Sequence, residues 1–191
     1  MPEINPVVLK RDNDIKLVPV SENEHYLNQM HDYSKLDEFY RYLEFDAFKS
    51  LNETKEYLKS LIDRSSSISS QYWFIVLTKE NIAVGTIGLH SLNAYRLSVE
   101  VGYGLSPHFQ GRGIFSKALN TILCHCFEDL GLARVVARTD IDNLASIKGL
   151  LRNGFKKEGV MRNFYRYSNE KGFSDCVILS KLAAEHEIKN S

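Results

Sequence analysis

Residues 99–119 read VEVGYGLSPHFQGRGIFSKAL, and this stretch decides the fold. Its first part alternates apolar residues with Glu100 and glycines, which predicts a strand whose apolar side chains share one face. Its last part opens an amphipathic run, which predicts a helix. Gly111 and Gly113 stand between the two patterns, and glycines at such a junction indicate a close approach to the backbone. The stretch therefore predicts a strand, a glycine-rich loop and a helix in direct succession.

The patterns on either side of this stretch alternate between strand and helix. Strands are expected at residues 15–20, 72–77, 82–89, 98–105 and 133–139, and two more between 155 and 182 around a turn at 169–172. Helices are expected within residues 22–64, from 115 to the stop at Gly131, and from a cap at Asp142 or Asn143 to Asn153. This order predicts an α+β fold with a central mixed sheet flanked by helices, in a single domain over residues 1–191.

The composition limits the classes of function. The chain has 191 residues, and 43% of them are apolar, which is enough for a core. Its 24 Lys and Arg residues balance its 24 Asp and Glu residues, so bulk charge attracts neither nucleic acid nor an acidic membrane. The apolar runs are too short to span a bilayer, and the N-terminus lacks a signal pattern. These features predict a cytoplasmic protein with no nucleic-acid or membrane partner.

The three cysteines are Cys124, Cys126 and Cys176. An odd number in a chain of this length indicates reduced thiols rather than a disulfide framework. Cys124, His125 and Cys126 invite a metal interpretation, but helical positions two apart do not share a face. No second ligand pair follows at zinc-finger spacing, so core packing is the preferred interpretation and no metal is expected.

The glycine loop has a physical interpretation of its own. A helix N-terminus presents four unpaired N–H groups and a partial positive charge, so it attracts anions. Gly111 and Gly113 would let the backbone wrap around a phosphate, and Arg112 adds charge nearby. A plain tight turn without a ligand is the alternative. The chain has neither the Gly-Lys-Ser/Thr of a nucleotide-binding loop nor a third glycine for a dinucleotide site.

Four motifs of the second half resemble those of the GNAT acetyltransferases. They are the stretch at 99–119, FEDLGLARVVARTDIDNLASIKGLLRNGF at 127–155, KKEGVMR at 156–162 and FSDCVILSKL at 173–182. The first half matches more loosely, through YRYLEFDAFKSLNETKEYL at 40–58. The resemblance is to the branch that acetylates protein N-termini, such as the ribosomal-protein alanine and serine N-acetyltransferases. It implies the GNAT acyl-CoA N-acyltransferase fold, with a mostly antiparallel sheet.

The resemblance also implies acetyl-CoA as cosubstrate. The family loop Gln-x-x-Gly-x-Gly/Ala matches at Gln110 and Gly113 and departs at Phe115, where larger apolar residues occur in this branch. The loop amides would hold the pyrophosphate. The strand edge before the loop would pair with the pantetheine arm, and one of its N–H groups would polarise the thioester carbonyl. The implied cofactor-binding residues are Tyr103, Gly104, Leu105, Gln110, Gly111, Arg112, Gly113, Ile114, Phe115, Ser116 and Asn143.

Glu100 is the candidate base, because its position matches the glutamate used in this branch. It should share a strand face with Gly102 and Gly104, where a substrate could fit. The alternative is a carboxylate that is paired with a neighbouring cation or with solvent. His90 is the rival base, but its place at the expected end of the preceding strand favours a strand-end role.

Ser146 is the candidate proton donor. Many GNAT enzymes use a tyrosine at the place where this chain has Leu150, and Ser146 corresponds to the serine proposed as acid in the ribosomal branch. The alternative for Ser146 is a local hydrogen bond within a capped helix turn. Asn143 could cap the same helix and also contact the pantetheine arm.

The implied reaction is acetyl transfer to a primary amine by direct attack in a ternary complex. A peptide α-amine with a pKa of about 7.7–8.0 is partly neutral at pH 7, whereas a lysine amine near about 10.4 is not, so a weak base serves an N-terminus. The alternatives are a small amine, such as a polyamine, an aminoglycoside or a nucleotide amino sugar, and a non-catalytic acetyl-CoA-binding module.

The acceptor itself is less defined by the sequence. Arg41, Tyr42 and Glu44 fall where this family forms its substrate-binding helices. A set of acidic residues leaves a cationic acceptor possible, although such sets usually form only a solvated surface. Its members are Asp32, Asp37, Glu38, Glu44 and Asp46. Dimers are common in this branch, and the sequence leaves a homodimer open.

Overall fold

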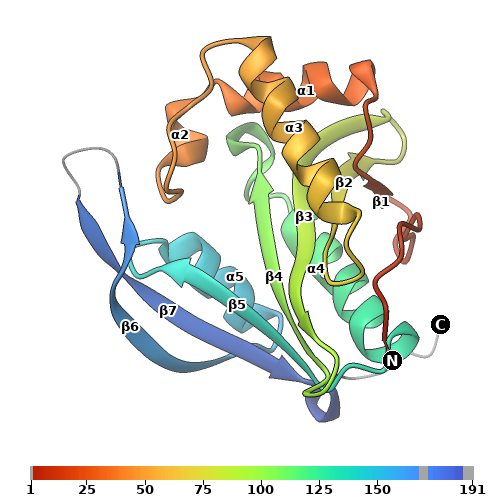
Figure 1. Ribbon diagram of the computed structural model, residues 1–191, viewed down its shortest axis with the longest axis vertical. Helices are drawn as coiled ribbons and strands as arrows, with labels where there is room; N and C mark the ends of the chain where they lie inside the picture. The colour runs from red at the N-terminus through yellow and green to blue at the C-terminus, as the bar shows by residue number, and fades with distance from the viewer. Residues whose placement is uncertain (1, 168–171, 187–191) are drawn as a thin grey trace.

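The chain is built on a seven-stranded sheet in the computed structural model, which describes residues 2–167 and 172–186 (Figure 1). The strand order is β1-β2-β3-β4-β5-β7-β6, and only β4 and β5 pair in parallel. The strands are β1 (Ile15–Pro19), β2 (Gln71–Leu77), β3 (Ile82–Asn93), β4 (Ser98–Leu105), β5 (Arg134–Asp140), β6 (Lys156–Arg166) and β7 (Phe173–Leu182). This mixed, mostly antiparallel sheet with its helices confirms the predicted α+β fold.

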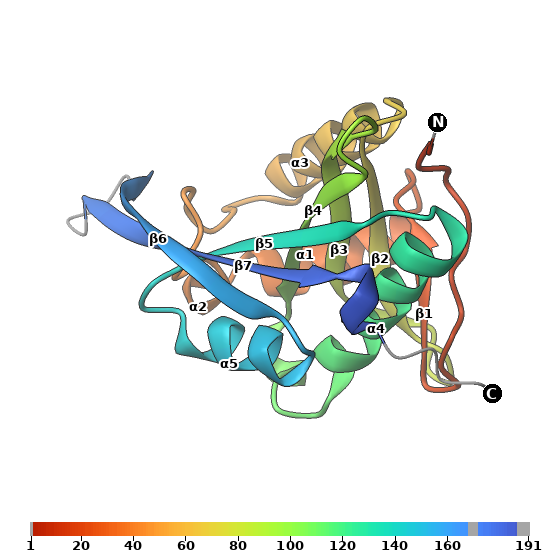
Figure 2. The ribbon, with the colours of Figure 1, turned by 90° about the horizontal axis from the view of Figure 1, so that it is seen from below.

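Helices cover both faces of the sheet, with α3 on one side and α4 and α5 on the other (Figure 2). The segments expected within residues 22–64 form α1 (Glu24–Ser34), α2 (Asp37–Tyr40) and α3 (Leu51–Ser65). The opposite layer contains α4 (Ile114–Cys124), a π-helical turn at His125–Asp129 and α5 (Leu144–Arg152). In the described ranges, no helix combines the length and the apolar character needed to cross a membrane.

The sheet separates two apolar cores. Successive residues of β2 point to opposite faces, as the period of a strand requires. Trp73 is fully buried on the α4 side, where it joins Leu119 in one cluster. Phe74 is fully buried on the other side, with Met30 of α1 and Leu58 of α3. The sheet is therefore packed on both faces, and the position of each helix over it is set by these contacts.

The sheet opens in the middle, between β4 and β5. Residues 98–100 of β4 pair with residues 134–136 of β5, and no further pair between these strands follows in the described chain. Beyond Glu100, β4 continues beside β3 as far as Leu105, while β5 continues beside β7 as far as Asp140. The two strands diverge from their shared end (Figure 1). This leaves one edge of β4 without a strand partner.

Two expectations about the elements need correction or limitation. The strand expected at 82–89 runs to Asn93, because a bulge with Ser91 at φ +57° lets pairing resume between Asn93 and Ser98. His90 therefore lies inside β3, opposite Glu100, and not at a strand end. The turn expected at 169–172 lies mostly outside the described residues.

Candidate active site

The glycine loop of the sequence leads directly into α4. Gly111 and Gly113 have φ of +73° and +76°, a region that costs other residues about 1–2 kcal/mol. A Cβ built on either glycine meets no atom within 4 Å, so the loop surface is open there. Gly113 is the N-cap residue of α4, and no side chain of the described chain caps this helix end. The Gln110 amide donates to the Leu105 carbonyl at 3.2 Å and ties the loop to the end of β4.

Phe115, the departure from the family loop pattern, packs away from these glycines. Its ring lies 4.4 Å from the Tyr103 ring, centroid to centroid. A Cβ added to Gly149 of α5 would approach a Phe115 ring carbon to 2.8 Å, so the ring fits against α5 only because residue 149 is glycine. Phe115 therefore fills space between α4 and α5 and leaves the loop surface uncovered.

Ser146 and Tyr103 meet where β4 has left β5. Their hydroxyl oxygens are 2.7 Å apart, which joins β4 to α5 by a hydrogen bond. Burial raises the pKa of Tyr103 above its usual range, against a lowering by this hydrogen bond. Asn143 accepts the Ser146 backbone N–H at 3.1 Å and caps α5, as expected. The Ser146 hydroxyl thus contacts Tyr103, whereas Leu150 is buried in the core.

Glu100 uses its two carboxylate oxygens differently. One oxygen accepts from Arg138 of β5 at 2.6 Å, and the other lies 4.0 Å from Nε2 of His90. The Glu100 side chain is 13% exposed. Burial raises the pKa of Glu100, and the Arg138 guanidinium opposes that rise. The cation pair that the sequence left as the alternative for Glu100 is therefore present, while its second oxygen still faces His90.

His90 is the residue whose place the sequence missed. Its pKa is lowered by burial first and then by the charges of Arg138 and Arg64, which favours the neutral imidazole. Nδ1 lies 3.2 Å from the Ser91 hydroxyl, and Nε2 would lie 3.4 Å from a Cβ at Gly102. Because β3 runs through position 90, the His90 ring lies beside Glu100. The strand expected from the sequence ended at residue 89, before the bulge, so the sequence did not predict this placement.

A small pocket lies over this part of β3 and β4. Its volume is about 210 Å³, and its wall is mostly aromatic and aliphatic. The lining residues are Met30, Tyr33, Ser34, Phe39, Leu43, Phe45, Tyr57, Leu61, Tyr72, Thr86, Gly88, His90, Gly102, Tyr103 and Gly104. No Asp, Glu, Lys or Arg is among these described residues. We call this the aromatic pocket.

Two rings lie against glycines of the sheet and line the aromatic pocket. A Cβ at Gly104 would meet the Phe39 ring at 2.7 Å, and a Cβ at Gly88 would meet the Tyr72 ring at 2.2 Å. The expectation that this face is open to a substrate is therefore wrong at Gly104, and at Gly102 a Cβ would lie in ordinary contact with the His90 ring. Phe39 covers Gly104 because α2 carries it onto the sheet.

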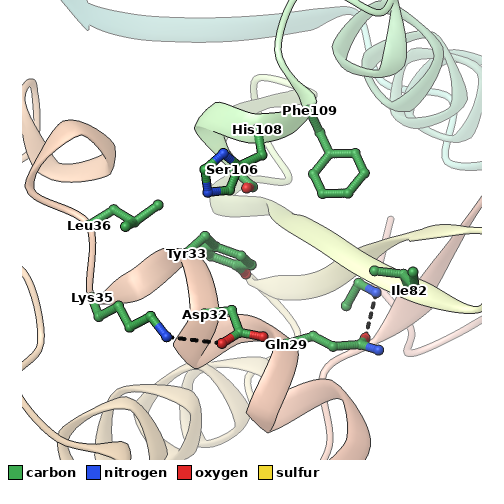
Figure 3. Close-up of a pocket in the computed structure, with 10 residues that line it drawn as sticks. Gln29, Asp32, Tyr33, Lys35, Leu36, Ile82, Ser106, His108 and Phe109 are labelled. Atoms are coloured by element: carbon green, nitrogen blue, oxygen red, sulfur yellow. Dashed lines mark hydrogen bonds and ion pairs between the residues drawn. The ribbon is translucent and has the colours of Figure 1, made fainter.

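A larger cavity of about 380 Å³ lies between α1 and the turn after β4 (Figure 3). Tyr33 lines both this cavity and the aromatic pocket. The other residues that line the larger cavity include Asp32, which forms an ion pair with Lys35 at 3.2 Å, and Gln29, which accepts the Ala83 N–H at 2.7 Å. Neither Glu100 nor the residues facing it line this cavity, so it lies apart from the candidate base.

The predicted substrate-binding segment reaches across the opening. The Glu44 carboxylate accepts the Arg166 backbone N–H of β6 at 3.0 Å, and Arg41 lies 5.4 Å over the Tyr42 ring. The segment after α2 lies between the outer ends of β4 and β6 (Figure 1). None of the acidic residues singled out in the sequence lines the aromatic pocket.

Within the described residues, Cys124, His125 and Cys126 do not come together as one set of potential metal ligands. His125 and Cys126 are buried, and the three cysteines are free thiols. Among the described residues, one possible ligand trio does occur: Cys124, Glu128 and His186 bring ligand atoms within 4.8 Å of one another. Glu128 is hydrogen-bonded there by Arg11 and His186.

A family model described as an acetyltransferase (GNAT) domain matches residues 14–156. This chain belongs to the GNAT acetyltransferase family. The N-acetyltransferase YoaA of Bacillus subtilis strain 168 is 31% identical over 133 residues, which cover 70% of this chain and 75% of that protein. The family match and this relative show that the chain is an N-acetyltransferase, as its resemblance to the GNAT family implied.

Other GNAT relatives differ in what their names say they acetylate. A ribosomal-protein-serine acetyltransferase of Escherichia coli K12 is 33% identical over 87 residues, 46% of this chain and 49% of that protein. A spermidine N(1)-acetyltransferase of the same organism is 24% identical over 180 residues, 92% and 91% of the two chains.

Solved GNAT structures share the fold. A GCN5-related N-acetyltransferase from Brucella melitensis superposes with a TM-score of 0.85 at 18% identity, covering 96% of this chain and 82% of that one. A complex of RimL, a ribosomal L7/L12 α-N-protein acetyltransferase, with coenzyme A gives 0.80 at 20% identity, covering 92% and 98%.

Proposed function

We propose that this enzyme transfers the acetyl group of acetyl-CoA to the α-amine at the N-terminus of a protein or peptide. The aromatic pocket is the observation that carries the choice of acceptor. A polyamine or aminoglycoside brings further cations, and the described lining offers them no carboxylate. Its volume of about 210 Å³ is also below the roughly 300–1,000 Å³ usual for small-molecule sites, but suits one terminal residue.

The cosubstrate fits the open side of the glycine loop. When bound, acetyl-CoA supplies an activated acetyl thioester. In this proposal the amides of residues 111–116 hold its pyrophosphate at the N-terminus of α4, where Gly111 and Gly113 leave room. The β4 edge at residues 103–105, which β5 leaves without a partner, binds the pantetheine arm as an added strand. Asn143 caps α5 beside the same opening.

Glu100 takes the proton of the attacking amine, directly or through one water. Burial raises the pKa of Glu100, and Arg138 favours its ionised form, so the carboxylate can accept a proton but stays a weak base. A weak base is sufficient because an α-amine is partly neutral at pH 7. Ser146, with its hydroxyl held by Tyr103, passes its proton to the departing thiolate and regains one through solvent from the protonated Glu100. The amine attacks within one ternary complex, so no enzyme cysteine takes part.

The acceptor class is tested by thiol release from acetyl-CoA with a panel of N-terminal peptides, polyamines, aminoglycosides and amino sugars. We expect turnover with peptides, and loss of turnover when the peptide α-amine is blocked by formylation. Turnover with the small amines alone would overturn the choice of acceptor. Mass spectrometry of the product locates the acetyl group and separates an α-amine from a lysine amine.

Glu100→Gln separates an enzyme base from a structural ion-pair partner. We expect kcat to fall about 10²-fold to 10⁴-fold, the usual range for a lost general base, with acetyl-CoA affinity retained. Glu158→Gln is the matched control, because Glu158 also forms an ion pair with an arginine of β5, Arg134. Unchanged kcat in a folded Glu100→Gln protein would exclude the role assigned to Glu100.

A further inference from the structure

The aromatic pocket also bears on the first residue of the acceptor, on condition that the proposed function holds. We propose that the enzyme prefers N-termini whose first side chain is large, apolar and uncharged, of the Met or Leu type, and that this side chain is seated in the aromatic pocket. Serine and alanine are then poor acceptors, although they are the residues acetylated in the branch that the sequence resembles.

The position of the pocket follows from the geometry of an amino acid. The α-amine and the Cβ of a terminal residue are bonded to the same Cα, so the two groups lie side by side. An amine that is placed against Glu100 and His90 leaves its side chain beside Gly102, where the His90 ring is the one described group within 4 Å of a Cβ. His90 and Gly102 both line the aromatic pocket, so the first side chain has that pocket as its nearest cavity.

The chemistry of the wall selects an apolar side chain. Phe39, Phe45, Tyr57 and Tyr72 line the pocket with ring surface, and an apolar side chain removes that surface from water. A serine or alanine side chain would leave most of the space filled with water. The Tyr33 and Ser34 hydroxyls are the two groups of this lining that are buried with no hydrogen-bond partner among the described residues, in a wall that is otherwise mostly aromatic and aliphatic.

The charges around the pocket disfavour charged side chains of either sign. Both cations that act on His90, Arg138 and Arg64, lie outside the lining, and Arg64 is 5.2 Å over the Tyr72 ring. A lysine side chain or a polyamine would have to enter a pocket without a carboxylate in its described wall, which costs the hydration of its cation. A carboxylate would have to enter a pocket without a cation in its wall, which costs its hydration. An uncharged side chain meets neither penalty.

The test compares peptides that are identical from the second residue onward and begin with Met, Leu, Ser, Asp or Lys, with spermidine as a separate arm. We expect kcat/KM for Met and Leu to exceed that for Ser by about tenfold or more, with Asp and Lys lowest. Equal rates for all five peptides, or a preference for Ser, Asp or Lys, would overturn the inference while leaving N-terminal acetylation intact. Turnover of spermidine alone would overturn the proposed function itself.

Two variants connect any preference to the pocket. Phe45→Ala removes a ring that lines the pocket and is 40% exposed, so the fold should tolerate it. We expect KM for the Met peptide to rise about tenfold and KM for the Ser peptide to stay within about twofold. Phe173→Ala is the control, since Phe173 is 59% exposed on β7 and lies outside the lining. An equal change for both peptides in Phe45→Ala would contradict the assignment.

Discussion

At the scale of single residues, two opposing effects set the base strength of Glu100, its burial and the charge of Arg138. Burial raises its pKa, and Arg138 at 2.6 Å lowers it. The same guanidinium also lowers the pKa of His90. The ion pair that the sequence could treat only as an alternative to catalysis is thus compatible with it, because a carboxylate must be ionised before it can accept a proton.

Removing the Arg138 charge should therefore move the pH profile. In Arg138→Gln the pKa of Glu100 rises, because the desolvated carboxylate loses the cation that favours its charged form. The base is then protonated up to a higher pH, so the rising limb of kcat/KM shifts to higher pH. The measurement is a pH–rate profile with one peptide, whose own amine titrates identically in both proteins.

The outcome of that profile also tests His90. The pKa of His90 should rise in the same variant, so a shift alone does not separate the two bases. If Glu100 is the base, the rising limb of kcat/KM in the double variant Glu100→Gln, Arg138→Gln should no longer contain the titration of an enzyme group. It should then follow the titration of the peptide amine alone. Arg134→Gln, on the same strand but paired with Glu158, is the control. A rising limb that stays fixed in Arg138→Gln would argue against both assignments.

At the scale of elements, the glycine loop and α4 act as one unit. Gly113→Glu places a negative charge and a side chain at the helix N-terminus, on a backbone with φ of +76°. We expect acetyl-CoA affinity to fall at least about tenfold, because the new carboxylate repels the pyrophosphate and occupies the open surface. Calorimetric titration of acetyl-CoA measures the change.

The control has to separate charge from backbone strain. Gly131→Glu makes the same substitution at a φ of +64° with open space around it, but at the far end of the same helical segment. It should lower the melting temperature to a similar degree and leave acetyl-CoA affinity unchanged. Equal losses of affinity in the two variants would show that strain, not the site, explains the effect of Gly113→Glu.

The elements also show what the sequence could predict. Periodicity located the seven strands and the helix after the glycine loop, since buried faces impose it directly. It missed the last part of β3, because Ser91 adopts its left-handed conformation without a glycine to signal it. The Glu100–Arg138 pair depends on the register of β4 against β5, and the cover of Phe39 over Gly104 depends on how α2 docks. Neither is a local property of the chain.

At the scale of the whole molecule, the two halves of the sheet have little direct pairing. β4 and β5 pair at three positions in the described chain, so other contacts must set the width of the opening beyond them. Tyr103 and Ser146 join the halves on the α5 side at 2.7 Å. Glu44 joins the segment after α2 to β6 on the other face. The opening is therefore held from both faces.

This arrangement predicts that Glu44→Ala affects the acceptor and not the cosubstrate. The variant releases the Arg166 N–H and loosens the segment that carries Phe45 into the aromatic pocket, so KM for peptides should rise about threefold to tenfold. Acetyl-CoA affinity should not change, and the loss of stability should stay within about 1 kcal/mol because the contact is exposed. Glu38→Ala on α2 is the matched control. A rise in KM of equal size in both variants would mean that Glu44 acts by charge alone and that the link to β6 is dispensable.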